Sequence, residues 1–323
     1  MIIVATLLFC VYFLLGYFKD RNWKILFAFL FLILSYLLKF SIDVTKTADY
    51  ENYLYLITLD LPEFSLKMLF AEPYFFQLGS WLIKYYSKEQ SLAFFTESSF
   101  IYSTIFFLWL AFLKDVSTFN RIIIFSLYYY FFAYIVFRNG PAYMLSGVSF
   151  YYLHKNIYIK TTVLLFLMHL SSLPVIFFSM FKNKLGDRKL IFICFLFIIF
   201  FNILVRIELF ALYDKFSFYA NEAEYGQSIF HKIYFYSFVL FNICLIYFKK
   251  DVIYNYTYLL LFVTYLILNY SNSVMGYRFS IYLTLYLMLN PKLDYSDENR
   301  PRLLYLIPIF FAIFIFNYLT LQK

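Results

Sequence analysis

The sequence predicts an all-α, polytopic integral membrane protein that forms one domain over residues 1–323, with about 10–12 transmembrane helices. Apolar residues make up 63% of the chain, charged residues 14%, and the mean hydropathy is +0.72. Soluble domains average roughly 45–50% apolar and about 25% charged residues. The apolar residues also gather in runs suited to crossing a bilayer. This composition excludes a soluble enzyme, a disordered chain and a nucleic-acid-binding domain.

Aromatic residues are unusually frequent, with 46 Phe, 35 Tyr and 3 Trp making up 26% of the chain. Two interpretations stay open at this point. AT-rich coding would produce the same excess. Alternatively, Tyr and Trp anchor helices at the membrane interface and offer rings on which sugars stack.

The first apolar run, Met1–Phe18, lacks a basic leader and a cleavage site, so we expect a retained helix and not a signal peptide. Lys19 and Arg21 follow it. Because positive residues stay on the cytoplasmic side, the N-terminus is expected outside. Ile25–Ile42 then returns outward and leads into a polar, acidic loop, Asp43–Ser65.

The remaining apolar segments are separated by short polar loops, except that a second long polar loop spans Arg206–His231. In chain order they are Met68–Tyr86, Ser91–Leu113, Ile122–Phe137, Ala142–Leu153, Thr161–Phe181, Leu190–Val205, Ile233–Phe248, Tyr254–Tyr270, Phe279–Leu289 and Leu303–Leu321.

The placement of positive charge tests how many segments cross. The basic loops lie near Lys19, Lys114, Lys155, Lys182, Lys249 and Pro291, and all are expected in the cytoplasm. They can share one side only if two segments fail to cross. Met68–Tyr86 and Thr161–Phe181 each carry a proline with polar neighbours, so we expect one or two re-entrant or broken segments beside a protein cavity. The two larger loops are then extracytoplasmic. The alternative is that all twelve segments cross.

Neither a metal nor a cofactor is expected. Cys10, Cys194 and Cys244 lie inside apolar runs, and the three histidines are too scattered for a zinc site. The chain also lacks a P-loop and a dinucleotide-binding fingerprint.

Arg138 is the clearest polar residue at membrane depth, where charges are costly and usually functional. It precedes Asn139-Gly140-Pro141, which predicts a helix start with proline in its first turn. A helix N-terminus offers free N–H groups to an anion, and a guanidinium can grip phosphate oxygens in a fork. The segment therefore predicts an anion site facing the extracytoplasmic side. The alternative is an arginine that snorkels from a span end.

Two further groups suit the same site. Ser271-Asn272-Ser273 supplies capping chemistry for a helix that Arg278 opens, and two arginines at two helix starts suit a diphosphate. Arg278 could instead snorkel. His169 lies in the middle of its segment and would act as a donor to phosphate or as a proton shuttle; a packed core histidine is the alternative.

The two long polar loops supply carboxylates. Asp49 and Tyr53 are four residues apart, on one face of a helix. Arg206, Glu222 and Glu224 lie in the second loop. A carboxylate here could act as general base on a sugar hydroxyl, and the alternative is an ordinary solvated acidic loop.

Five motifs in this order resemble the EpsG-like group of Wzy-type polymerases, which extend surface polysaccharides. Asn139 stands where that family usually has Gln, and Gly140-Pro141 is unusual for it. The matching motifs are Asp49-Tyr50-Glu51-Asn52-Tyr53, Glu72-Pro73-Tyr74-Phe75 with Leu78, Arg138-Asn139-Gly140-Pro141-Ala142, His169-Leu170-Ser171-Ser172, and the late Arg278.

The resemblance implies a bacterial O-antigen or capsule polymerase in the cytoplasmic (inner) membrane, with its active site facing the periplasm or outside. Its substrates would be undecaprenyl-diphosphate-linked oligosaccharides, and the glycan would pass from one diphosphate to the non-reducing end of another repeat unit. A chain-length regulator and a flippase are candidate protein partners, and nucleic acid is not.

On this reading, Arg138, Arg278 and His169 act on the diphosphate, and Glu72 is a candidate base alongside Glu222 and Glu224. Asp49, Tyr53, Asn139 and Arg206 would contact the substrate. The rival functions are a flippase or transporter of lipid-linked oligosaccharides, and a related lipid-linked-sugar glycosyltransferase or ligase. The absence of an internal sequence repeat disfavours a flippase.

Overall fold

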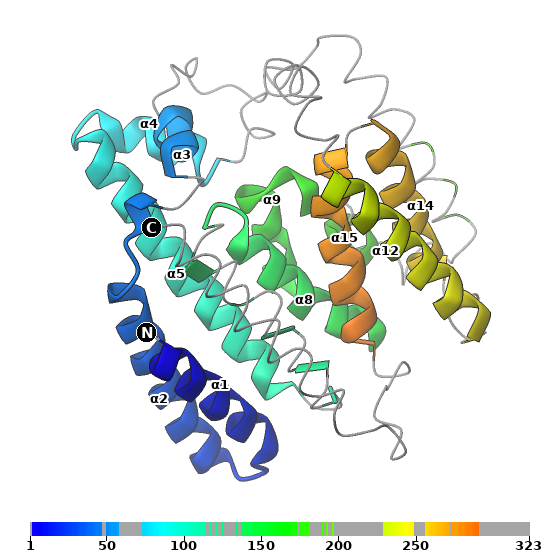
Figure 1. Ribbon diagram of the computed structural model, residues 1–323, viewed down its shortest axis with the longest axis horizontal. Coiled ribbons are helices and arrows are strands. Elements are labelled where there is room, and N and C mark those ends of the chain that lie inside the picture. The colour runs from blue at the N-terminus through cyan, green and yellow to red at the C-terminus, as the bar shows by residue number, and fades with distance from the viewer. Residues whose placement is uncertain are drawn as a thin grey trace.

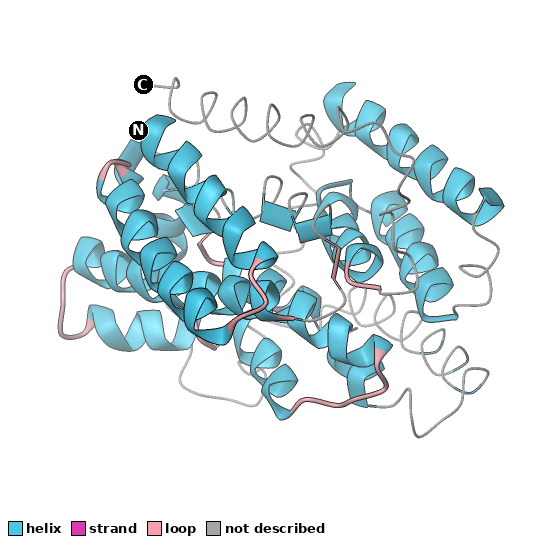
Figure 2. Ribbon diagram, turned by 90° about the horizontal axis from the view of Figure 1, so that it is seen from below, coloured by secondary structure: helices cyan, strands magenta, loops and turns pink. Residues whose placement is uncertain are grey.

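The computed structural model describes residues 2–46, 50–57, 73–113, 116–117, 120–121, 124–125, 129, 133–134, 137–172, 175–180, 189, 192, 196, 229–248, 256–271 and 273–290. Within these residues the regular structure is helical and no strand occurs (Figure 2), which confirms the all-α prediction for this part of the chain. Several sequence predictions lie outside the described residues, namely Asp49, Glu72, Arg206, Glu222, Glu224 and Leu303–Leu321.

The first two helices, α1 (Ile2–Tyr17) and α2 (Arg21–Phe40), form an antiparallel pair at the lower left of Figure 1. The side chain of Asp20 caps α2, because its Oδ1 accepts from the backbone N of Asn22 at 2.7 Å and of Trp23 at 3.2 Å. This cap explains why the helix begins at Arg21, before the apolar run from Ile25 on which the sequence prediction relied.

The long helix α5 (Lys88–Phe112) packs against both members of this pair. It opens with a capping box, in which Ser87 Oγ accepts from Gln90 N at 3.2 Å and Gln90 Oε1 accepts from Ser87 N at 3.1 Å. The box moves the helix start three residues ahead of the predicted Ser91.

Two of the described helices, α2 and α5, are both long and apolar enough to cross a membrane. Shorter apolar helices cover Ile3–Tyr17, Lys232–Tyr247 and Tyr256–Tyr270.

A stack of aromatic rings binds α1 and α2 to α5 and to the residues that follow it. The ring centroid of Tyr12 lies 4.6 Å from that of Phe107, and the ring centroid of Phe107 lies 4.4 Å from that of Tyr129.

The helix α8 (Gly140–His154) lies at the centre of the fold and is buried on nearly every face. It packs between α5 and α15 (Ser273–Met288). The Tyr143 hydroxyl donates to the carbonyl of Arg278 at 3.4 Å, and His154 Nε2 donates to the carbonyl of Tyr286 at 2.9 Å. The first bond joins the N-terminal parts of α8 and α15, and the second joins their C-terminal ends. The two helices therefore run parallel.

The helices α12 (Ile229–Phe248) and α14 (Tyr256–Ser271) lie beside α15, on the right of Figure 1. Hydrogen bonds tie the group together. Tyr258 donates from its hydroxyl to Asn242 Oδ1 at 2.6 Å, and the Tyr234 and Ser280 hydroxyls lie 2.7 Å apart.

The C-terminal ends of α5, α8 and α15 meet at one end of the molecule. The guanidinium of Arg121 donates to the carbonyls of Ala111 and Leu113 at the end of α5, and Asn120 Nδ2 donates to the carbonyl of Met288 at 2.9 Å. The helix ends that lead toward Lys114, Lys155 and Pro291 therefore lie together, while the placement of these loops in the cytoplasm stays a prediction.

Two short helices, α3 (Tyr50–Ile57) and α4 (Phe76–Ile83), occupy the opposite, upper end in Figure 1. Eight residues of helix span about 12 Å, against about 30 Å of hydrocarbon, so α4 cannot cross. Residues 68–72 lie outside the described part of the chain, so the failure of the whole segment Met68–Tyr86 to span stays a prediction. The predicted loop Asp43–Ser65 contains α3, because Tyr53 and Ile57 form one buried face.

The segment Thr161–Phe181 is broken, as predicted. It consists of the 3-10 turn Lys160–Val163, the five-residue helix α9 (Leu164–Met168), the 3-10 turn Leu170–Ser172 and a helical stretch at 175–180. The chain becomes extended at His169, with φ −158° and ψ 131°. Figure 1 shows α9 near the middle of the molecule, and α9 packs against α8.

Candidate functional site

Arg138 lies in the turn that leads into α8, and its side chain is buried. It is 3% exposed, and its Cζ lies 5.7 Å from the ring centroids of both Phe75 and Phe76. A snorkelling arginine keeps its guanidinium in water, so that alternative is excluded. Cation–π contact at this range stabilises a buried guanidinium without neutralising it, and Arg138 therefore stays a positive charge in an aromatic setting.

Asn139 follows as the N-cap residue of α8 and is also 3% exposed. Its side chain does not cap the helix, and its Oδ1 has no hydrogen-bond partner among the described residues. A buried acceptor without a donor costs free energy unless something else supplies one. An amide oxygen accepts from O–H groups and repels anions, so it suits a sugar hydroxyl better than a phosphate.

Tyr53 and the Phe75 motif lie directly beside Arg138. The Tyr53 ring centroid lies 4.3 Å from that of Phe137 and 5.9 Å from that of Phe75. The close approach of α3 and α4 requires glycine at position 79, because an added Cβ there would lie 2.8 Å from Ile57 Cγ1. The described members of the first three predicted motifs therefore form one cluster.

The broken segment joins this cluster through Tyr74. The Tyr74 backbone N–H donates to the carbonyl of Leu167 at 3.0 Å, and the Tyr74 and Ser98 hydroxyls lie 2.5 Å apart. Two residues after Leu167, His169 is 5% exposed and its Nδ1 lies 2.6 Å from the Ser171 hydroxyl. His169 is thus a buried residue that makes specific polar contacts.

Arg278 lies in the second turn of α15 and is half-buried. The hydroxyl of Tyr143, one turn after Asn139, donates to its carbonyl. The Tyr143 and Tyr282 ring centroids are 4.8 Å apart. The backbone that carries Arg278 is therefore fixed against the first turn of α8, as the prediction of two neighbouring helix starts requires.

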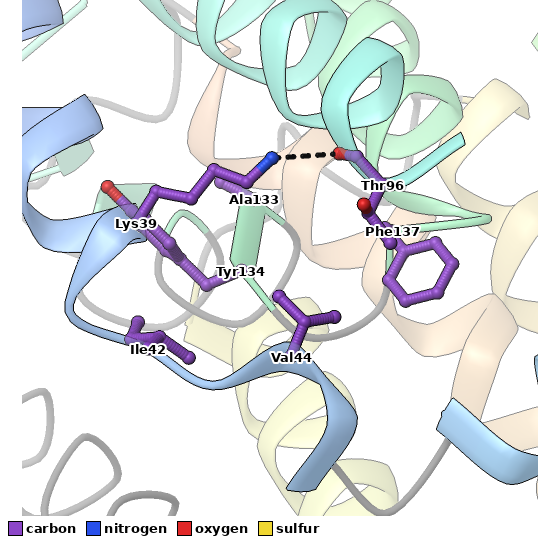
Figure 3. A pocket seen from close by; sticks show the side chains of 7 residues that line it. All are labelled: Lys39, Ile42, Val44, Thr96, Ala133, Tyr134 and Phe137. Carbon is purple, nitrogen blue, oxygen red and sulfur yellow. Dashed lines mark hydrogen bonds between the residues drawn. The ribbon is translucent and has the colours of Figure 1, made fainter. Parts of the chain in front are cut away.

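A narrow pocket adjoins the Arg138 turn (Figure 3). It is lined by Lys39, Ile42, Val44, Thr96, Ala133, Tyr134 and Phe137. Lys39 Nζ donates to the carbonyl of Thr96 at 3.3 Å and pairs with Glu97 Oε1 at 2.7 Å. The side chain of Lys39 is 9% exposed and that of Glu97 is 52% exposed. This ion pair ties α2 to α5 next to the site.

Negative charge gathers at the outer edge of the same end. Burial, and then the carboxylates of Glu89, Glu51 and Asp43, raise the pKa of the Tyr50 phenol above its usual value. The Tyr50 hydroxyl therefore keeps its proton at neutral pH. Asp43, Glu51 and Glu89 are exposed, whereas Arg138 is buried.

Three polar groups of the structure were not predicted from the sequence, namely Tyr143, Tyr282 and the Lys39–Glu97 pair. Tyr143 and Tyr282 each lie four residues after a predicted site residue, Asn139 and Arg278, and so share a helical face with it; that spacing was the available signal. Among the described residues no group of His, Cys, Asp or Glu could hold a metal ion.

The comparisons with known proteins identify the family of the chain. A family model described as the EpsG family matches residues 24–323, which is nearly the whole chain. No curated protein and no solved structure matches the chain.

Proposed function

We propose that this chain, which belongs to the EpsG family, is a bacterial surface-polysaccharide polymerase acting on undecaprenyl-diphosphate-linked repeat units. Family membership and the apolar helices make it a membrane protein of polysaccharide-polymerase type. The finer proposal is that it transfers a growing O-antigen or capsule glycan from one lipid diphosphate to the non-reducing end of another lipid-linked repeat unit.

One observation carries the proposal. One described residue from each of the five predicted motifs, Tyr53, Phe75, Arg138, His169 and Arg278, belongs to a set of elements that are joined by contacts. They are far apart in sequence and come from α3, the turn before α4, the start of α8, the broken segment and α15. A charge buried at membrane depth is costly and usually functional, and an anionic substrate would account for the buried guanidinium of Arg138.

In the proposed mechanism, Arg138 and Arg278 hold the diphosphate. The glycosidic C–O bond between the donor sugar and the diphosphate breaks, and the negative charge on the leaving oxygen grows. The two guanidinium groups stabilise that charge, and Arg138 is already held in a buried position beside Phe75 and Phe76; preorganised stabilisation of this kind is usually the largest contribution to catalysis. The lipid diphosphate leaves as the anion, so no nucleotide sugar is needed.

The acceptor sugar supplies the attacking oxygen. Its hydroxyl oxygen forms the new C–O bond, and its proton passes to a carboxylate, for which Glu72, Glu222 and Glu224 are the candidates. Asn139 Oδ1, a buried acceptor, binds a sugar hydroxyl. Asp49, Tyr53 and Arg206 position the glycan, and the acidic rim around Tyr50 suits hydroxyl groups better than a second anion.

We further propose that the protein lies in the cytoplasmic (inner) membrane with the α3–α4 end facing the periplasm or outside. This orientation puts the basic loops at the opposite end, in the cytoplasm. A flippase would then deliver the substrate, and a chain-length regulator would limit the product.

The test is elongation by the purified protein in liposomes, supplied with a synthetic lipid-diphosphate repeat unit. A ladder of products supports a polymerase. Movement of the lipid across the bilayer without elongation would indicate a flippase, and transfer to a different acceptor would indicate a ligase. Arg138→Ala should abolish the ladder, whereas Arg21→Ala, which removes an exposed arginine at the opposite end, should leave it intact.

A further inference from the structure

A directed chain of hydrogen bonds joins the broken segment to α15. His169 Nδ1 lies 3.1 Å from the backbone N of Ser171 and 2.6 Å from Ser171 Oγ. Ser171 Oγ in turn lies 2.8 Å from the Tyr282 hydroxyl. A backbone N–H can only donate, so His169 Nδ1 accepts this bond and carries no proton.

The direction of the remaining bonds follows. Since His169 Nδ1 accepts, the Ser171 hydroxyl donates its one O–H to that nitrogen. The Ser171 oxygen then accepts a hydrogen bond from the Tyr282 hydroxyl. A neutral imidazole has one N–H, which must then be on Nε2. The Nε2 atom is buried, and a donor in such surroundings makes a stronger hydrogen bond than one in water.

We propose that Ser171 and Tyr282 are positioning residues that hold His169 in its Nε2–H tautomer, so that it donates a hydrogen bond to an oxygen of the lipid diphosphate. This inference rests on the proposed function. It decides between the two roles that the sequence leaves open for His169, because a histidine whose Nδ1 is occupied and whose Nε2 bears the proton acts as a donor and not as a base.

The position of Tyr282 explains the arrangement. Tyr282 lies four residues after Arg278, on the same face of α15, and its ring packs against Tyr143, which bonds to the Arg278 carbonyl. One hydroxyl therefore couples the orientation of His169 to the helix that carries Arg278. A donor and a cation set in fixed relation suit the two phosphoryl groups of a diphosphate.

The tautomer is tested first, by NMR of the protein labelled with ¹⁵N-histidine, with the His169 signals assigned from His169→Gln. The wild type should show a protonated Nε2 and an unprotonated Nδ1. Ser171→Ala and Tyr282→Phe should produce a mixture of tautomers, and Ser171→Thr should restore the single form. Ser172→Ala is the matched control, because its Oγ bonds to the carbonyls of Leu165 and His169 and not to the ring.

The role in elongation is tested with two amides that copy different ring nitrogens. The amide of Gln reaches the place of Nε2 and supplies a donor, whereas the shorter amide of Asn reaches only the place of Nδ1. His169→Ala and His169→Asn should slow elongation about 100-fold, the usual cost of one donor to a developing anion. His169→Gln should retain activity within about tenfold of the wild type, since a neutral donor remains.

The results separate the positioning role of Ser171 and Tyr282, the donor role of His169 and the proposed function. A wild-type spectrum with the proton on Nδ1 would overturn the positioning role, as would Ser171→Ala and Tyr282→Phe variants with an unchanged tautomer. Equal inactivity of His169→Gln and His169→Ala would overturn the donor role. A protein that shows the expected tautomer yet makes no ladder would instead overturn the proposed function, while the bonding around His169 stood.

Discussion

The guanidinium of Arg138 is buried beside Phe75 and Phe76 and also carries a permanent positive charge. A planar guanidinium meets both, because it stacks on aromatic rings and also grips phosphate oxygens in a fork. The ammonium group of lysine keeps the charge, but it is not planar and cannot bind two phosphate oxygens in a fork.

We therefore expect Arg138→Lys to lose most of the elongation activity, by about tenfold or more. The measurement is the rate of ladder formation at saturating lipid substrate, with the thermal midpoint in detergent as a check on folding. A lysine variant with the wild-type rate would show that charge alone suffices and that the stacked geometry of Arg138 has no role.

The Lys39–Glu97 pair offers a prediction about stability at the residue scale. Replacing Glu97 by Gln leaves the Lys39 ammonium buried without a counter-charge, which should lower the free energy of unfolding by about 1–3 kcal/mol. The double variant Lys39→Met with Glu97→Leu should recover much of this loss, because it removes both charges. Thermal unfolding of the wild type, the single variants Lys39→Met and Glu97→Leu and the double variant measures the coupling, and additive single effects would contradict it.

At the scale of elements, the crossing of α14 and α15 depends on Gly276. A Cβ added there would lie 2.5 Å from Asn269 Cβ and 2.6 Å from Asn269 Cα, so the backbone itself would have to move. At Gly147 in α8, by contrast, the nearest atom to an added Cβ is the flexible end of Leu289, at 3.2 Å.

Gly276→Ala should therefore lower the free energy of unfolding by about 1–3 kcal/mol, the usual cost of overpacking, and shift α15 with its Arg278. Gly147→Ala is the matched control and should cost less, because a side chain can yield and alanine favours the helix. Denaturation in detergent and the elongation rate are both measured. Equal effects at the two glycines would contradict the tight crossing.

Arg121 caps the end of α5, where the last carbonyls of the helix would otherwise lack donors. Its guanidinium donates to the carbonyls of Ala111, Leu113 and Val116, and Gly16 in α1 packs against its side chain. Arg121 and Arg138 are thus two buried arginines with different tasks.

Arg121→Met should reduce the free energy of unfolding by about 1–3 kcal/mol through unsatisfied carbonyls, while the elongation rate per folded molecule stays unchanged at low temperature. A lysine at this position should recover part of the stability. Loss of elongation in a folded Arg121→Met protein would refute the division of tasks between the two arginines.

At the scale of the whole molecule, the helix ends define two faces. The C-terminal ends of α5, α8 and α15 are joined by Asn120, Arg121 and His154, and the short helices α3 and α4 lie at the other end with the start of α5 (Figure 1). In the proposed topology, a membrane crossed by the long helices separates the two faces.

Cysteines placed at Lys88 and Lys155, in a protein whose native cysteines are replaced by serine, should accordingly react with an impermeant thiol reagent from opposite sides. Both positions are exposed, at the start of α5 and just after α8. Labelling of intact spheroplasts should reach position 88 and not position 155. Reaction of both from the same side would refute the topology and the outward-facing site.

Much of the helical layout could be predicted from the sequence. Apolar runs gave the existence and order of α1, α2, α5, α12 and α14, and the proline and polar residues of Thr161–Phe181 marked it as broken. The boundaries differed where a local cap decided them. Asp20 and the Ser87–Gln90 box begin α2 and α5 earlier than hydrophobicity indicates, because hydrogen bonds of polar residues add turns that a hydropathy pattern does not record.

By itself, the sequence determined that the chain is helical and apolar, that one helix begins just after Arg138 and another lies around Arg278, and that the motifs resemble one family. Only the tertiary structure decided that Arg138 is buried under two rings, that α8 and α15 run parallel, and that Tyr282 reaches His169 through Ser171. The physical reason is the separation along the chain of the residues that interact. Periodicity and caps are set by neighbours within a few residues, whereas these contacts join residues more than sixty positions apart, and packing of the whole chain selects them.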